Sequence, residues 1–227
     1  MPFDGLRDFV EITLIALAAL LPIVDPLGGA PIYLAMITEL SPPERVRTAR
    51  LVAINSFVLL AASILIGAYV LDFFGVSIPA VQVGGGFIVC AIAWSLLSSP
   101  NSPAVSDRKS TASSDGDGLS QRAFYPLTMP LTVGPGSISV AITLGANPPR
   151  GLRPLLTTAL AHVLGVLITA LSVYFCYRYA DRILRRLGKT GTNALIRLTA
   201  FILFCIGVQI MWNGVRSLIE SVLKPAG

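Results

Sequence analysis

Long runs of uncharged residues constrain this chain more than any other feature of its sequence. A helix that crosses the hydrocarbon core of a bilayer needs roughly 20 apolar residues, and few other structures satisfy all their backbone polar groups there. Runs free of Asp, Glu, Lys and Arg cover residues 51–71, 73–95, 123–146, 154–177 and 198–215. A sixth segment, residues 12–38, is interrupted only by Asp25. We therefore expect an all-α membrane protein with six transmembrane helices.

The composition supports the same class. Charged residues make up 13% of the 227 residues, hydrophobic residues make up 54%, and the mean hydropathy is +0.74. Soluble domains carry about 25% charged residues. The net charge of +5 does not indicate a nucleic-acid partner, because the chain has no soluble domain to carry one. We expect membrane lipids as its surroundings and no nucleic acid among its partners.

The sequence lacks the motifs of metal sites and of familiar enzymes. Cys90, Cys176 and Cys205 lie inside expected spans without CxxC spacing, so neither a disulfide framework nor a zinc site is expected. Walker A, GxSxG and HExxH motifs are absent. We expect no cofactor, no metal and no enzymatic activity. An intramembrane enzyme that uses Asp25 or His162 as an acid or base is the alternative, although such work usually needs a second positioned group.

Positive charges are distributed unevenly between the connections, and membrane proteins concentrate them on the cytoplasmic side. Eleven follow the first, third and fifth spans: Arg45, Arg47, Arg50, Arg108, Lys109, Arg122, Arg178, Arg182, Arg185, Arg186 and Lys189. Five lie on the opposite side: Arg7, Arg150, Arg153, Arg216 and Lys224. We expect an inner-membrane protein with both termini outside the cytoplasm. Mixed charges before residue 12 are unlike a cleavable signal, so we expect the first segment to be retained.

The interrupted segment carries its acid in the sequence LPIVDPLGGAPIYL, residues 21–34. Thirteen uncharged residues lie on each side of Asp25. Because Asp is a favoured N-cap and Pro suits the first helical position, Asp25 and Pro26 predict a half-helix that ends near Thr38. Pro31 is the alternative start. A lone acid at the bilayer centre costs about 3 kcal/mol, which makes it a functional candidate, although capping alone would also account for it.

A second interrupted segment follows about half a chain later, in YPLTMPLTVGPGSIS, residues 125–139. Pro135 lies 109 residues after Pro26, and the stretch from Gly188 lies about 113 residues after the stretch from Gly75. Two units of three spans must sit upside down relative to each other, and inverted repeats with broken helices are typical of secondary transporters. We predict two inverted three-helix repeats, with the first helix of each broken near the midplane. Their predicted bounds are 1–99 and 122–227, joined by a flexible polar linker at 100–121.

The two breaks suggest a binding site. The helix start at Gly134 has no side-chain cap, so its N–H groups stay available to an anion. We hypothesise that the Gly134 to Ser137 turn takes a carboxylate, while Asp25 faces an ammonium group or carries a coupling proton. The candidate substrate-binding residues are Asp25, Gly28, Gly29, Gly134, Gly136, Ser137, Asn55, Asn193 and Arg197, and the proton-coupling candidates are Asp25 and His162.

Each of the other polar candidates has a simpler interpretation. Arg197 either pairs with Asp25 or a substrate carboxylate, or extends to the cytoplasmic interface. His162 either relays protons or hydrogen-bonds a neighbouring helix. Asn55 either binds a polar ligand or joins helices by a hydrogen bond.

Three motifs together resemble the MarC-like membrane proteins: DPLGGAPIY (25–33), PLTMPLTVGPGSI (126–138) and GKTGTNALIRL (188–198). The resemblance covers nearly the whole chain. It implies a fold of the lysine-exporter superfamily type and proton-driven movement of glycine, alanine and similar amino acids. The sequence departs from the common pattern at Thr199 and Ala200, where the resemblance leads us to expect a Gly soon after the Arg.

The leading expectation is therefore a secondary transporter of small neutral amino acids such as glycine and alanine. We expect it to be coupled to protons and to work by alternating access between the two repeats. An exporter of another small metabolite and a non-transporting membrane protein are the alternatives. A chain of this size would also suit a homo-oligomer.

Overall fold

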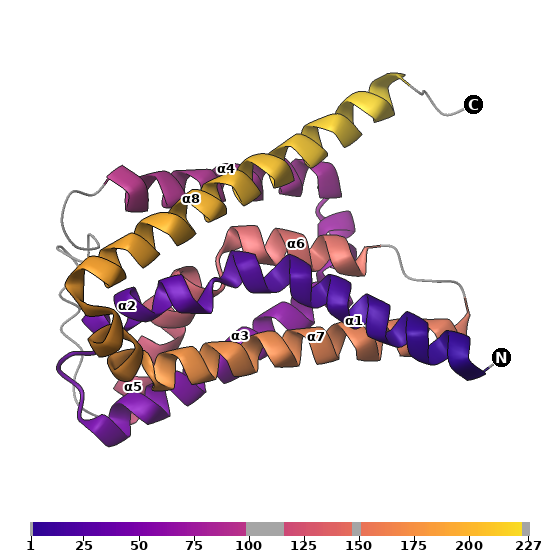
Figure 1. Ribbon diagram of the computed structural model, residues 1–227. Coiled ribbons are helices and arrows are strands. Elements are labelled where there is room, and N and C mark those ends of the chain that lie inside the picture. Colours follow the sequence, from indigo (N-terminus) through magenta and orange to yellow (C-terminus); the bar gives the residue numbers. More distant parts are fainter. Residues whose placement is uncertain (1, 99–115, 147–150, 224–227) are drawn as a thin grey trace.

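The computed structural model describes residues 2–98, 116–146 and 151–223, and within these ranges the ordered elements are helices (Figure 1). In chain order they are α1 (Pro2–Val24), α2 (Pro26–Met36), α3 (Pro42–Phe73), α4 (Ile78–Ser98), α5 (Gly116–Arg122), the irregular wide-turn segment η1 (Ala123–Thr132), α6 (Pro135–Gly145), α7 (Leu152–Arg178) and α8 (Ala180–Leu223). Most of the predicted linker lies outside the described residues. Its last part is helical, because α5 runs directly into η1.

Membrane-spanning helices account for most of this structure. Five segments of the described chain are long and apolar enough to cross a bilayer: Leu6–Met36, Pro42–Phe73, Ile78–Ser98, Pro154–Arg178 and Ala180–Leu223. A further pair of segments, Gly118–Thr132 and Pro135–Gly145, passes the same test together but is bent by 73°. The all-α class and the membrane-spanning helices are thus confirmed. The count of six spans depends on the bent pair crossing as one unit and stays a prediction.

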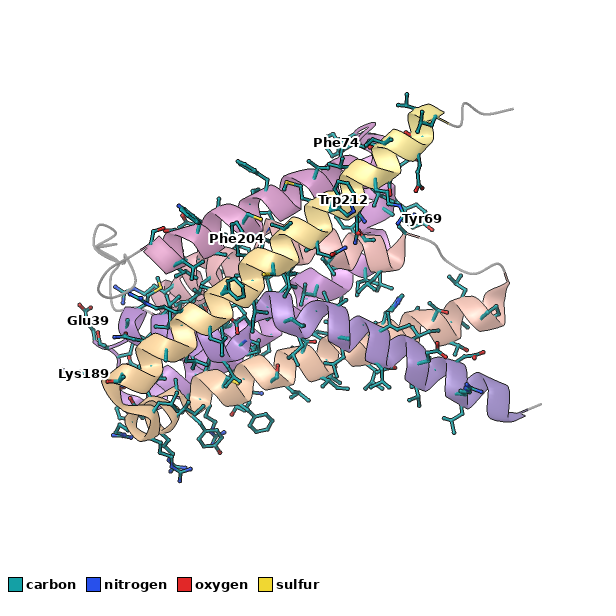
Figure 2. The ribbon with its side chains drawn as sticks, turned by 45° about the horizontal axis from the view of Figure 1, so that its top comes forward. Glu39, Tyr69, Phe74, Lys189, Phe204 and Trp212 are labelled. Carbon is teal, nitrogen blue, oxygen red and sulfur yellow. The ribbon has the colours of Figure 1, made fainter. Side chains whose placement is uncertain are left out.

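The two ends of the helix bundle differ. The N-terminal end of α1 and the C-terminal end of α8 lie at one end of the molecule, on the right in Figure 1, and the α2–α3 and α7–α8 connections lie at the other. Figure 2 places Tyr69, Phe74 and Trp212 at the former end and Glu39 and Lys189 at the latter. Trp212 lies 23 positions after Lys189, a helical rise of about 34 Å, close to the roughly 30 Å hydrocarbon core. Trp and Tyr side chains favour the boundary between the hydrocarbon core and water, which is consistent with Tyr69 and Trp212 lying near one surface of the membrane.

Helices pair between the two halves of the chain. α4 packs along α8, and α3 packs along α7, while α1 lies against α7 and α6 lies against α3 and α4. Glycines permit the closest of these approaches, since a Cβ on Gly86 would lie 2.6 Å from the Gly207 carbonyl oxygen. Small residues of this kind let membrane helices gain van der Waals contact. The fully buried side chains include Leu20, Tyr33, Leu60 and Val166.

Both predicted half-helices are present, but their breaks differ in form. α2 and α6 each have 11 residues and each begin with Pro, as the capping pattern predicts. Each is about 16 Å long, half the thickness of a hydrocarbon core. At the first break only Asp25 leaves the helix, with φ 44°, and α1 and α2 remain one candidate span. At the second break the 73° bend follows an irregular segment in which Tyr125 and Met129 have extended backbones.

A third pair of matching positions lies before the last helix of each half. Gly75 has φ 66° before α4, and Gly188 has φ 67° inside α8, where it separates the first turns from the long span. Both angles lie in the left-handed region that favours glycine. The sequence spacing of about 113 residues predicts that these two positions correspond.

Candidate functional site at the first helix break

Asp25 joins two helices. Its backbone N–H donates to the Leu21 carbonyl at 3.0 Å, and its own carbonyl accepts from Gly29 N–H at 2.9 Å. Its side-chain Oδ1 accepts from Gly28 N–H at 3.0 Å, so the carboxylate is the N-cap of α2. Asp and Asn are among the few side chains that tolerate left-handed backbone, because they can bond locally. The predicted cap is confirmed, and the side chain is half-buried.

Because Gly28 has no side chain, the Asp25 carboxylate can occupy the space beside it. A Cβ on Gly28 would overlap the Asp25 carboxylate and would lie 2.5 Å from Thr199 Oγ1. Thr199 comes from α8, and its hydroxyl faces the carboxylate while donating to the Leu195 carbonyl at 2.9 Å. Of the two positions at which we expected a Gly, Thr199 and Ala200, α8 thus places Thr199 beside Asp25.

Gly29 faces a second hydroxyl group. A Cβ on Gly29 would lie 2.7 Å from the Tyr177 hydroxyl oxygen, near the end of α7. That hydroxyl is 2.8 Å from Thr132 Oγ1 at the end of η1, and both side chains are buried. Thr132 Oγ1 also donates to the Leu127 carbonyl at 2.8 Å. Elements α2, α7, η1 and α8 thus bring small polar groups together at Asp25, and we call Asp25, Gly28, Gly29, Tyr177, Thr132 and Thr199 the Asp25 cluster.

Tyr177 of this cluster stacks on a second tyrosine, Tyr33. The rings of Tyr33 and Tyr177 lie 4.2 Å apart between centroids, with an interplanar angle of 15°. Tyr33 is fully buried, and its hydroxyl donates to the Arg45 carbonyl at 2.9 Å. The Arg45 guanidinium in turn donates to the Thr38 carbonyl at 2.7 Å and lies 3.8 Å from Asp181. These contacts link the buried pair to the surface at the α2–α3 connection.

A polar cavity lies beside Tyr177. Its volume is about 340 Å³, and its lining includes Ile37, Arg45, Tyr177, Asp181 and Arg182. Tyr177 belongs both to this lining and to the Asp25 cluster. Tyr177 therefore links the lining of this cavity to the Asp25 cluster.

The second break lies beside the first through a packing contact. A Cβ on Gly136 would overlap the Val89 side chain and would lie 3.4 Å from Ile23 Cδ1, two residues before Asp25. Ser137 is buried, and its hydroxyl donates to the Gly134 carbonyl at 2.9 Å. Gly134 is the uncapped N-cap of α6, as predicted. The turn is closely packed against α4 and α1.

The remaining sequence candidates lie outside the Asp25 cluster. Asn55 donates to Thr128 Oγ1 at 3.5 Å, so it joins α3 to η1. Asn193 and Arg197 are exposed on α8, and no ion pair joins Arg197 to Asp25. His162 is buried in α7, about 22 Å along the helix axis from Tyr177 by helical rise. The structure thus brings Asp25, Gly28 and Gly29 together with residues that the sequence did not single out.

The missed residues are Thr132, Tyr177 and Tyr33. Thr132 and Tyr33 stand inside the two family motifs, in PLTVGPG and APIY, so the motifs themselves carry a signal. Tyr177 stands immediately before a run of basic residues and is indistinguishable in the sequence from an interfacial tyrosine. Only the packing of α7 against α2 reveals its position.

The spans, the broken helices and an acid enclosed between them define a polytopic α-helical integral membrane protein. The chain belongs to the MarC family: the family model, described as MarC family integral membrane protein, matches residues 10–219. The resemblance inferred from the three motifs is thereby confirmed.

Curated relatives align over most of the chain. The inner membrane protein MarC of Salmonella typhimurium strain LT2 is 30% identical over 210 residues, and that of Escherichia coli O1:K1 is 30% identical over 215. In both cases the alignment covers 91% of this chain and 95% of the relative. No solved structure matches this chain.

Proposed function

We propose that this chain is a secondary transporter of small neutral amino acids such as glycine and alanine, located in the inner membrane, and not an enzyme. The observation that carries the proposal is the half-buried Asp25 carboxylate at a helix break, flanked by two glycines and three hydroxyl side chains. An acid inside a membrane span is costly, so it is retained where it binds or moves charge. The name of the relatives, inner membrane protein, supports the location.

The proposed architecture is two inverted three-helix halves with the breaks near the midplane. Three observations support it: the equal lengths of α2 and α6, the matching left-handed angles of Gly75 and Gly188, and the pairing of corresponding helices across the halves. Transporters built this way bind their substrate where the breaks meet.

In the proposed binding mode, the ammonium group of the amino acid faces Asp25. Its carboxylate meets the first N–H groups of α6, at Gly136 and Ser137, where the helix dipole favours an anion. A Cβ on Gly136 would lie 3.4 Å from Ile23 Cδ1, so the second break packs against α1 just before the first. Thr199 and Tyr177 lie close to Gly28 and Gly29, and this close packing favours a substrate with a small side chain.

Alternating access uses the tyrosine pair as a barrier. Tyr177, which stacks on Tyr33, belongs to the Asp25 cluster and also lines the 340 Å³ cavity, and the ion-paired Arg45 and Asp181 line the same cavity. Both charged partners are partly exposed, so their ion pair is weak enough to open. Proton coupling follows if the Asp25 carboxylate binds a proton when the site is open to one side of the membrane and the substrate ammonium group when it is open to the other.

The test is flux in liposomes. Purified protein is reconstituted, and uptake of labelled glycine and of labelled alanine is measured with and without an imposed proton gradient, against liposomes without protein. Gradient-dependent uptake of either amino acid is the expected result. A folded, correctly inserted preparation that moves neither would overturn the substrate assignment, and hydrolysis of a substrate without redistribution would indicate an enzyme instead.

A further inference from the structure

We propose that the surface groove between α3 and α7 is a binding site for one anionic phospholipid, with its phosphate at Arg50 and an acyl chain along the groove. The groove has a volume of about 410 Å³. It is separate from the Asp25 cluster and from the cavity beside Tyr177. The proposal goes beyond transport and does not depend on the identity of any transported molecule.

The groove has a polar end and an apolar end. Arg50 and Tyr174 form one end. Phe57, seven residues after Arg50 in α3, and Leu167, seven residues before Tyr174 in α7, form the other, about 10 Å away by helical rise. Ala53 and Ala170 lie between, and their small side chains leave the depression between the two helices. A hydrocarbon chain parallel to the helices fits this shape.

The polar end presents cations at a membrane boundary. Arg50 is the last charged residue of α3 before the uncharged run 51–71, and its side chain is exposed. Within the described parts of the chain, Arg50 has no hydrogen-bond or ion-pair partner. A second guanidinium group lies close by, because Arg178 donates a hydrogen bond to the Tyr174 hydroxyl.

This arrangement selects a phosphate that carries a net negative charge. Arginine binds phosphate oxygens through two parallel N–H donors, and such charge-assisted bonds are the stronger ones. An unpaired arginine at the edge of the hydrocarbon core gains from an anion at the same depth, which a lipid headgroup supplies. A zwitterionic lipid offers the same tail but carries its own cation near the phosphate, so it competes less well.

The test compares lipid binding by the full chain in detergent, using native mass spectrometry with phosphatidylglycerol and with phosphatidylcholine. We expect wild type to retain phosphatidylglycerol in preference. Arg50→Gln should lose that preference about tenfold, the value of one charge-assisted hydrogen bond of roughly 1.5 kcal/mol. Arg47→Gln is the matched control, since Arg47 is exposed on the same helix but does not line the groove.

A second variant tests the groove itself. Ala53→Leu adds bulk between the two ends without changing charge, so it should reduce retention of both lipids. Equal retention of the two lipids by wild type, or equal effects of Arg50→Gln and Arg47→Gln, would overturn the proposal. If amino-acid flux is intact but the lipid preference is absent, only the lipid-site proposal fails. If flux is absent but the lipid preference is present, only the transport proposal fails.

Discussion

At the scale of single residues, Asp25 combines two roles that few side chains can share. It adopts a left-handed backbone at φ 44° and caps the following helix through Gly28 N–H at 3.0 Å. Asn shares both abilities but carries no charge. The Asp25→Asn substitution therefore separates the acid from the cap, whereas Asp25→Ala removes both.

Gly29 gives the most direct test of the packing around the Asp25 cluster. We predict that Gly29→Ala lowers the free energy of unfolding by about 1 to 3 kcal/mol, because the added Cβ would lie 2.7 Å from the Tyr177 hydroxyl oxygen. Ala is otherwise the better helix former by about 1 kcal/mol, so a loss must come from that contact. Unfolding in mixed micelles measures the change.

Tyr177→Phe is the matched partner in a double-mutant cycle. It removes the hydroxyl, and the remaining ring atoms lie at an ordinary 3.6 Å from the new Cβ. On its own it loses the hydrogen bond to Thr132, worth about 1 kcal/mol. Gly29→Ala should cost less in the Phe background than in wild type. Equal costs in both backgrounds would mean that Tyr177 does not lie over Gly29.

The sequence predicted the cap but not its surroundings. Asp25, Pro26 and Gly134 follow local rules, since capping and proline geometry depend only on neighbours in the chain. Thr132 and Tyr177 meet Gly29 through contacts between distant segments, which no local pattern encodes. Thr199 was noticeable only as a departure from a family pattern. Arg197 was a candidate because it is charged, yet the residue is exposed.

At the scale of elements, the two halves differ more than their motifs suggest. The first break is one residue within a candidate span, whereas the second includes η1 and a 73° bend. Two prolines inside η1, Pro126 and Pro130, remove backbone donors that a regular helix would use. The sequence predicted that both segments break. Their different geometry depends on how each packs against the other half.

The kink in α8 should depend on glycine. Gly188 has φ 67° and ψ −179°, a conformation essentially restricted to glycine. We predict that Gly188→Ala lowers the free energy of unfolding by about 1 to 3 kcal/mol, although no atom lies within 4 Å of the added Cβ. Gly84→Ala is the control, because Gly84 is helical and equally open, and it should be neutral or slightly stabilising. Equal effects of the two substitutions would refute the backbone explanation.

At the scale of the whole molecule, the bilayer made much of the fold predictable. Uncharged runs of about 20 residues must be helices where no water is available, and the helices occur where the runs are. Their mutual arrangement did not follow from the sequence, because lipid-facing and protein-facing sides are equally apolar. Contacts such as Gly86 with Gly207 therefore became apparent only in the structure.

The sidedness of the termini is testable with single cysteines. In a background with Cys90, Cys176 and Cys205 replaced by Ala, we place a cysteine at Arg7, Val222 or Lys189, all exposed. A membrane-impermeant maleimide added outside intact cells should label the first two and not the third, because basic residues gather at the end that carries Lys189. Labelling of Lys189→Cys alone would invert the proposed topology.

We propose that the Asp25 carboxylate couples transport to protons, and a comparison of exchange with accumulation tests this coupling. Liposomes loaded with unlabelled alanine are used to compare exchange of labelled alanine with its gradient-driven accumulation, for wild type, Asp25→Asn and Asp25→Ala. We predict that Asp25→Asn, which keeps the cap and whose amide oxygen still accepts a hydrogen bond from the substrate ammonium group, retains exchange at reduced affinity and loses accumulation. Asp25→Ala should in addition lose about 1 kcal/mol of stability with the cap. Accumulation by Asp25→Asn at the wild-type level would contradict the account and leave Asp25 as a helix cap alone.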